Sequence, residues 1–194
     1  MKSDSTLIIY AHPQTKGHCS FILDNVKKYL KSKKIKHELI DLYKIKYDPV
    51  LKSEEHYSAG NNFVSSQNKK FQKSISKADK IIFIYPVWWG SMPSILKGFF
   101  ERIFVSGFAF KFSKKGIPVK LLAGKRALVF MTTGSPTIFA KLFLGNRHKK
   151  MIKFHILEYC GIKTKVVQFG NARHLDQNKS KLENGVRKAL DSFF

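Results

Sequence analysis

Residues able to bind a ligand gather in three short stretches of this sequence. The first is HPQTKGHCS, residues 12–20, which combines hydroxyls, a glycine and potential cations. The second is PVWWG, residues 86–90, which holds both tryptophans of the chain, and the third is TTG, residues 132–134. Donors for a phosphate, flat aromatic surface and small hydroxyl residues would together suit a planar molecule with a phosphate tail.

The first stretch has the composition of a phosphate-binding loop. A loop that leads into a helix N-terminus offers unpaired backbone N–H groups, and the helix dipole favours negative charge there. The stretch matches neither G-x-G-x-x-G nor G-x-x-x-x-G-K-[ST], so an ordinary capped turn stays open as the alternative. The candidate binding residues here are His12, Gly17, His18, Cys19 and Ser20.

The second stretch could supply the aromatic wall of a site. Successive side chains of an extended segment point to opposite sides, so we expect one of Trp88 and Trp89 in the core and the other at the rim. The alternative is that both are packing residues. The candidate binding residues here are Pro86, Val87, Trp88, Trp89 and Gly90.

The third stretch, Thr132, Thr133 and Gly134, offers small hydroxyl side chains and accessible backbone. A planar heteroaromatic with a single phosphate would satisfy all three stretches, because its faces would meet aromatic side chains and its ring polar atoms backbone groups. Flavin mononucleotide (FMN) fits that description.

The elements that must position these stretches alternate along the chain. Short apolar runs predict five buried strands, at residues 6–11, 37–42, 79–85, 126–131 and 164–169. Helical spacing predicts helices near residues 18–33, 63–76, 94–104, 149–160 and 176–193, and residues 108–112 alternate like a hairpin arm. This order predicts an α/β fold, a doubly wound parallel sheet with helices on both faces. The three stretches follow the first, third and fourth strands, so they should meet at the carboxyl edge of the sheet, where such folds bind ligands.

Composition places the chain among globular proteins. Its 194 residues favour a single domain, 1–194, and the hydrophobic fraction of 43% gives no case for disorder. Because no long apolar run and no secretory signal is evident, we expect a soluble, cytoplasmic protein. Cys19 and Cys160 have neither CxxC spacing nor clustered partners, so we expect no metal site and no disulfide.

The unusual quantity is the charge: 36 Lys and Arg against 13 Asp and Glu give +23. Such a sum favours anionic neighbours, namely nucleic acid, acidic lipid or small anions. The lysines are dispersed and no nucleic-acid-binding motif accompanies them, which favours a solvated basic surface over nucleic-acid binding. An anionic partner stays open.

A longer motif carries a resemblance to a known family. PVWWGSMPSILKGFFERIF at residues 86–104, followed by GFAF at 107–110, resembles the flavodoxin-like NAD(P)H:quinone oxidoreductases. That family includes the modulator-of-drug-activity reductases and the ancillary subunits of potassium efflux systems. YAHP at 10–13, TTG at 132–134 and YCGI at 159–162 extend the resemblance over nearly the whole chain. It implies a flavodoxin-like five-stranded parallel sheet of strand order 2-1-3-4-5.

The resemblance also implies an activity. A bound flavin, FMN or the longer FAD, would be reduced by NADPH or NADH and reoxidised by a quinone or similar acceptor. Residues 12 and 17–20 would hold the flavin phosphate end, backbone amides of 86–90 the isoalloxazine edge, and 132–134 its pyrimidine side. The flavin carries the hydride, so no side chain is assigned an acid or base role.

The sequence departs from the family in the phosphate loop. Relatives have a Ser-Phe-Asn-like run where this chain has Gly17-His18-Cys19, and Thr15, Lys16, His18 and Ser20 are the donors that could substitute.

The family's homodimers, whose acceptor site is completed by the partner chain, would give exposed Phe99, Phe100 and Phe104 a role. Two other functions stay open: a regulatory flavoprotein subunit of a membrane potassium efflux system, in peripheral contact with the membrane or the transporter, and a basic-surface binding protein.

Overall fold

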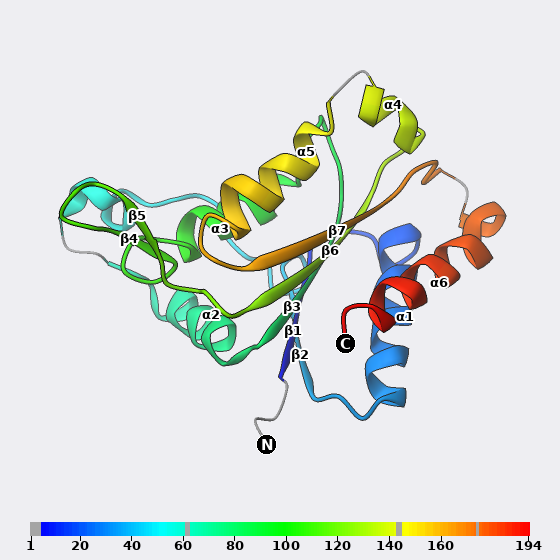
Figure 1. Ribbon diagram of the computed structural model, residues 1–194, viewed down its shortest axis with the longest axis horizontal. Helices are drawn as coiled ribbons and strands as arrows, with labels where there is room; N and C mark the ends of the chain where they lie inside the picture. The colour runs from blue at the N-terminus through cyan, green and yellow to red at the C-terminus, as the bar shows by residue number, and fades with distance from the viewer. Residues whose placement is uncertain (1–4, 61–62, 143–144, 174) are drawn as a thin grey trace.

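The computed structural model describes residues 5–60, 63–142, 145–173 and 175–194, and it confirms the predicted α/β fold. Five parallel strands form one sheet in the order β2-β1-β3-β6-β7 (Figure 1). This order is the predicted 2-1-3-4-5, since β4 and β5 form a separate antiparallel hairpin. The sheet strands are β1 Thr6–Tyr10, β2 His37–Asp41, β3 Lys80–Pro86, β6 Arg126–Thr132 and β7 Lys163–Phe169, and the hairpin strands are β4 Phe110–Phe112 and β5 Pro118–Lys120.

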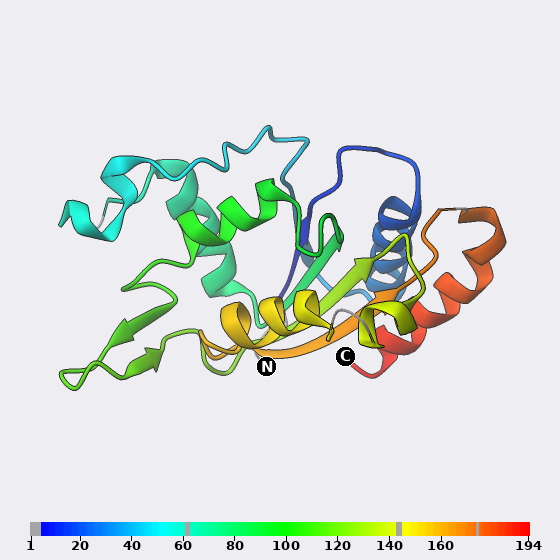
Figure 2. The ribbon, with the colours of Figure 1, turned by 90° about the horizontal axis from the view of Figure 1, so that it is seen from above.

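Helices cover both faces of the sheet. One face carries α1, His18–Ser32, and α6, Leu175–Asp191; the other carries α2, Ser66–Lys77, and α3, Ser94–Ile103 (Figures 1 and 2). The shorter helical segments are η1 Ser53–Glu55, η2 Tyr57–Ala59, α4 Thr137–Leu142, α5 Arg147–Lys150 and η3 Met151–Leu157. Within these described residues, no helix combines the length and the apolar character needed to cross a bilayer.

The central strand β3 explains why the molecule has two cores. Its side chains alternate between the two faces, as a period of two requires. Phe83 and Tyr85 join the core under α2 and α3, whereas Ile82 and Ile84 join the core under α1 and α6. All of them are almost completely buried.

The structure corrects the prediction for three phenylalanines of α3. Phe99 and Phe100, and Phe104 directly after the helix, are 0%, 3% and 8% exposed, so they belong to the core and are not the exposed side chains that were expected. The Phe100 ring lies 5.4 Å from that of Phe83, which fixes α3 against the sheet. The apolar face of this helix is fully used by its own chain.

The helix predicted over 149–160 also differs. The chain forms the short α5 and then continues as a π-helix, η3, in which N–H groups bond five residues back. The N–H of Glu158, for example, donates to the carbonyl of Lys153 at 2.8 Å. Apolar spacing does not distinguish this wider turn from an α-helix. Gly161 ends the segment at φ 97°, as expected of a C-terminal cap.

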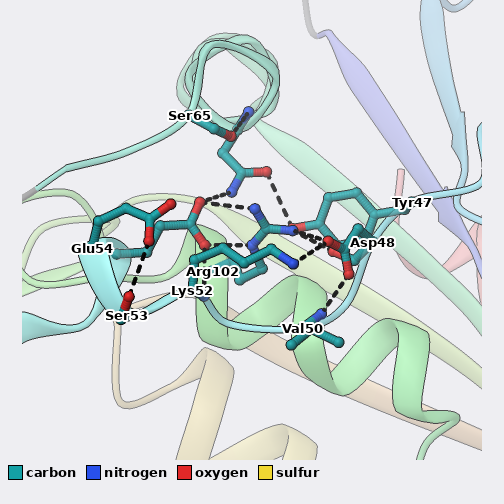
Figure 3. Close-up of polar contacts among 10 residues, drawn as sticks. Tyr47, Asp48, Val50, Lys52, Ser53, Glu54, Ser65 and Arg102 are labelled. Carbon is teal, nitrogen blue, oxygen red and sulfur yellow. Dashed lines mark hydrogen bonds and ion pairs between the residues drawn. The ribbon is translucent and has the colours of Figure 1, made fainter.

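A buried ion pair attaches the segment after β2 to α3 (Figure 3). Arg102 donates to both carboxylate oxygens of Glu55, with Nε–Oε2 and Nη2–Oε1 distances of 2.6 and 2.8 Å. Its Nη1 donates to the backbone oxygen of Asp48. Asn68 Nδ2 donates to Glu55, and Tyr47 donates to Asn68. Every strong acceptor of Glu55 is therefore satisfied inside the protein, as a buried carboxylate requires.

Candidate functional site

A cavity of about 390 Å³ opens at the carboxyl edge of the sheet. The segments after β1, β3 and β6 all contribute to it, as predicted, and the segment after β7 adds a fourth wall. Its lining residues are His12, Lys16, Gly17, His18, Cys19, Pro86, Val87, Trp88, Thr132, Gly134, Ala172, Arg173 and Leu175. The predicted residues Ser20, Trp89, Gly90 and Thr133 lie outside this lining.

One end of the cavity is suited to an anion. Helix α1 begins after Gly17, which has no side chain to cap it and adopts φ 128°. The first N–H bonded within the helix is that of Phe21, so the N–H groups of residues 18–20 are the unpaired donors of the helix start. Lys16 and Arg173 add positive charge, and none of the described residues that line the cavity is a carboxylate. Backbone donors, the helix dipole and two cations therefore act on the same space.

Two expected donors of the phosphate loop are engaged within the protein. The Ser20 hydroxyl donates to the carbonyl of Gly17 at 2.9 Å. Cys19 is buried, and its Sγ lies 3.3 Å from Thr132 Oγ1. Burial raises the pKa of the Cys19 thiol to about 12, more than the Thr132 hydrogen bond lowers it. The thiol stays neutral and joins α1 to β6, so these two residues could reach a phosphate only through their backbone N–H groups.

His18 occupies an unusual position. Its side chain is 8% exposed, and its Nε2 is buried without a hydrogen-bond partner. Burial lowers the pKa of His18, which favours the neutral imidazole. The side chain also lines a second cavity of about 210 Å³, whose other polar residues include Gln168, Asn178 and Lys181. His18 thus stands in the wall between the two cavities.

The tryptophan turn differs from its predicted form. The backbone groups of Trp88 and Ser91 bond to each other in both directions at 2.9 Å. Trp89 and Gly90 have φ values of 51° and 73°, as in a type I′ turn, so the segment is not extended. Trp88 is 39% exposed and Trp89 is fully exposed, which makes the expectation that one of them belongs to the core wrong.

Trp88 is the tryptophan that lines the cavity, and its ring lies 5.9 Å from that of His12. Gln14 donates its backbone N–H to His12 Nδ1 at 3.0 Å, which holds the imidazole in place. The N–H of Val87 donates to the carbonyl of Thr132, and that of Trp88 to Ser91. These two amides are therefore not available to a ligand, which leaves those of Trp89 and Gly90 as candidates in this turn.

The loop after β6 is held by side-chain hydrogen bonds. Thr133 Oγ1 donates to the carbonyl of Ser135 at 3.0 Å and accepts from Gln168 Nε2 at 3.1 Å. Gln168 Oε1 in turn lies 3.0 Å from Nε2 of buried His148. Thr133 therefore shapes the loop from outside the cavity, while Thr132 and Gly134 line it.

Sequence reasoning missed the wall after β7. Ala172, Arg173 and Leu175 line the cavity, and Arg173 Nε lies 3.8 Å from where a Cβ on Gly134 would stand. The carboxyl-edge rule applies to every parallel strand. A search of the loop after the fifth predicted strand for cations would have found Arg173.

A larger cavity of about 670 Å³ lies between the hairpin and the segment after β2, and its lining is mainly apolar. It shares no lining residue with the cavity at the carboxyl edge. Its lining residues are Leu51, Glu55, His56, Tyr57, Phe63, Val64, Glu101, Phe104, Val105, Ser106, Phe110 and Phe112.

The strand order, with a cavity at the switch point of the sheet, defines a flavodoxin-like protein. A model of the family with a flavodoxin-like fold matches residues 4–192. An uncharacterised NAD(P)H oxidoreductase of Haemophilus influenzae is 29% identical over 177 residues, 90% of this chain and 87% of its own. FMN-dependent NADH:quinone oxidoreductase 2 of Clostridium perfringens is 31% identical over 156 residues, 78% of this chain and 76% of its own.

Among solved structures, the crystal structure of Smu.1420 from Streptococcus mutans superposes with a TM-score of 0.84 at 29% identity, over 95% of this chain and 98% of that one. The chain therefore belongs to the flavodoxin-like family of NAD(P)H:quinone oxidoreductases.

Proposed function

We propose that the protein is a cytoplasmic flavoenzyme that binds FMN, takes a hydride from NADPH or NADH, and passes it to a quinone or a similar two-electron acceptor. The observation that carries the proposal is the cavity at the carboxyl edge, where an uncapped helix start, Lys16 and Arg173 face the same space with no carboxylate among the lining residues. A ligand with a phosphate tail and a flat ring fits this donor set.

FMN, when bound, supplies hydride transfer between the nicotinamide and the acceptor. The chain's own residues bind and orient it. The backbone N–H groups of residues 18–20, with Lys16 and Arg173, would hold the phosphate, while Trp88 and His12 would form the wall beside the ring. The same positive groups would stabilise negative charge that develops during reduction.

Support for FMN rather than FAD comes from a named relative. The Clostridium perfringens protein, which is 31% identical, is an FMN-dependent NADH:quinone oxidoreductase. The phosphate end of the cavity also holds a single cluster of donors at the start of α1.

An absorbance spectrum of the purified protein, followed by release of the chromophore, tests the cofactor. We expect the two visible bands of an oxidised flavin and FMN as the released compound. Without oxygen, NAD(P)H should then reduce the bound flavin once, and its continued oxidation should require an added quinone. A colourless preparation that takes up no added FMN would rule the proposal out, and release of FAD would overturn its choice of flavin.

We also propose that the protein is a homodimer. The 670 Å³ cavity is rimmed by exposed aromatic side chains from two separate segments, Tyr57 at 80%, Phe63 at 45% and Phe112 at 57%. Exposed aromatic clusters of this kind are typical of protein interfaces. This surface replaces the buried phenylalanines of α3 as the candidate interface.

A further inference from the structure

We propose that His18 binds the phosphate of the cofactor as an imidazolium, so that FMN binding takes up a proton at this side chain. This inference rests on the proposed function and adds to it a coupling between cofactor affinity and pH. His18 is one of the residues by which this chain differs from the Ser-Phe-Asn-like run of its relatives. The proposal explains this difference as a means of binding phosphate.

The first argument is the unsatisfied nitrogen. His18 is more than nine-tenths buried, it lines the candidate cofactor cavity, and its Nε2 has no partner. A buried polar atom without a hydrogen bond destabilises the protein, so a ligand that supplies the missing partner is favoured. A half-turn of the ring exchanges Nε2 with Cε1 in the same space, so the nitrogen can change its direction without moving the backbone.

The second argument is the charge around the imidazole. Lys16, Arg173 and Lys181 approach the two cavities from the loop after β1, the segment after β7 and α6. The other titratable groups among the described lining residues are His12 and the Cys19 thiol, and the pKa of that thiol is raised by burial, so it carries no charge near pH 7. Among the described residues, neither cavity has a carboxylate in its lining, and the nearby acidic residues of α1 and α6, Asp24, Asp176 and Glu183, line neither of them. With no anion to compensate it, a proton on His18 is disfavoured in the free protein.

A bound phosphate reverses this balance. It places up to two negative charges beside the imidazole and accepts a hydrogen bond from its N–H, and both effects favour the protonated form. The pKa of His18, lowered by burial in the free protein, should therefore rise in the complex. Between the free and the bound pKa, each unit of pH increase should weaken FMN binding by up to about tenfold through this residue.

The direct test is an NMR titration of the His18 ring of the full-length protein, with and without bound FMN. We expect the midpoint to rise by about one unit or more when FMN is present, which corresponds to about a tenfold preference of FMN for the protonated form. An unchanged or lower midpoint would contradict the proposal. This measurement needs no substitution and does not depend on activity.

The second test is FMN affinity between pH 5.5 and 8.5, measured by quenching of flavin fluorescence. The FMN phosphate itself titrates near pH 6, so the comparison is between wild type and His18→Phe, which fills the space and cannot be protonated. We expect the ratio of wild-type to variant affinity to fall about tenfold or more across this range. His18→Gln should behave like His18→Phe, and the control His37→Gln, at the exposed first residue of β2, should follow wild type.

Riboflavin, which lacks the phosphate, should show no pH dependence that His18 controls. If wild type and His18→Phe have parallel pH profiles for FMN, or if riboflavin shows the same dependence, the proposal fails while FMN binding itself stands. If neither NMR nor fluorescence detects FMN binding at any pH, the proposed function fails and this inference with it.

Discussion

At the residue scale, the cavity contains groups of two kinds. The Cys19 thiol forms a hydrogen bond with Thr132, and the Ser20 hydroxyl donates one to the carbonyl of Gly17. These two side chains therefore shape the site. Lys16, His18 and Arg173 are the ionisable groups left to meet a ligand at its phosphate end. The family's hydroxyl and amide side chains at this loop are thus replaced by cations drawn from two distant parts of the chain.

Arg173 offers a direct test at this scale. We expect Arg173→Ala to weaken FMN binding by about ten- to a hundredfold, because a hydrogen bond to a charged group contributes roughly 1.5–3 kcal/mol. Riboflavin binding should change little, since it has no phosphate. Flavin fluorescence quenching measures both affinities.

The matched control is Arg187→Ala, which removes an arginine of α6 that lies away from the cavity. Its FMN affinity should equal that of wild type. Equal losses in the two variants would mean that Arg173 acts only through the general positive charge.

At the element scale, α3 depends on a glycine and an arginine that attach the segment after β2. A Cβ at Gly98 would lie 2.1 Å from the carbonyl oxygen of Pro49, so only glycine allows this contact. Arg102 holds Glu55 one turn further along. The segment that rims the 670 Å³ cavity is therefore positioned by α3.

Gly98→Ala should destabilise the protein, although helix propensity alone favours alanine by about 1 kcal/mol. The backbone of Pro49 must move to admit the methyl group, and that displacement outweighs the gain. Urea denaturation should show a lower midpoint. Ser180→Ala, at an exposed position of α6, should instead leave stability equal or slightly higher. A Gly98→Ala variant that is more stable than wild type would contradict the close contact between Gly98 and the Pro49 backbone.

Arg102→Met should cost about 3–5 kcal/mol, because it leaves the Glu55 carboxylate buried without its partner. Lys97→Met, which breaks the exposed Lys97–Glu101 pair on the same helix, should cost less than about 1 kcal/mol. Urea denaturation curves of the two variants give the comparison. Similar losses would contradict the dominant role of the buried pair.

The pH dependence of stability gives the same pair a second test. Burial raises the pKa of Glu55, but the hydrogen bonds and charge of Arg102 outweigh it and the net pKa is lowered from 4.5. A lowered pKa stabilises the folded state above the unfolded value and loses that contribution as pH falls through the folded value. Wild type should therefore lose stability below about pH 4.5 through this group. In Arg102→Met the same acidification should neutralise the unpaired buried carboxylate of Glu55. The effect of acid on stability through this group should therefore change from a loss to a gain.

At the scale of the whole molecule, the net charge of +23 surrounds a cavity without carboxylates. Such a field attracts anions such as FMN and NAD(P)H and speeds their association. The +23 charge alone does not specify a partner. The cavity indicates where on the molecule an anion would bind. The exposed aromatic rim of the 670 Å³ cavity is the other large-scale feature, and it is the surface on which the dimer proposal rests.

Phe112→Asp should dissociate the proposed dimer. A central interface aromatic contributes about 2 kcal/mol or more, so the dimer dissociation constant should rise by roughly thirtyfold or more. Sedimentation equilibrium measures it directly. Ile45→Asp, at a position of similar character outside the cavity lining, should leave the constant unchanged. A wild-type protein that is monomeric at all concentrations would refute the dimer.

Much of the fold could be predicted because periodicity and apolar runs are local. The five strands and the carboxyl-edge position of the candidate site follow from alternation along the chain together with the rules of parallel sheets, whereas the strand order came from the resemblance to the flavodoxin-like family. The turn at Trp88 and Trp89 was not predicted, because positive φ at a tryptophan is rare, even though Gly90 suits the second central position of such a turn. The π-helix η3 was not predicted either, because its apolar spacing matches that of an α-helix.

By itself, the sequence determined the class of fold and the three loops that meet at the carboxyl edge of the sheet, because these follow from the order of elements. Only the tertiary structure decided which side chains are free to act. In the folded protein the side chains of Ser20 and Cys19 form hydrogen bonds with other residues, the phenylalanines of α3 are buried, and Arg173 lies beside Gly134. The physical reason is that hydrogen-bond satisfaction and burial depend on neighbours distant in sequence, which no local pattern records.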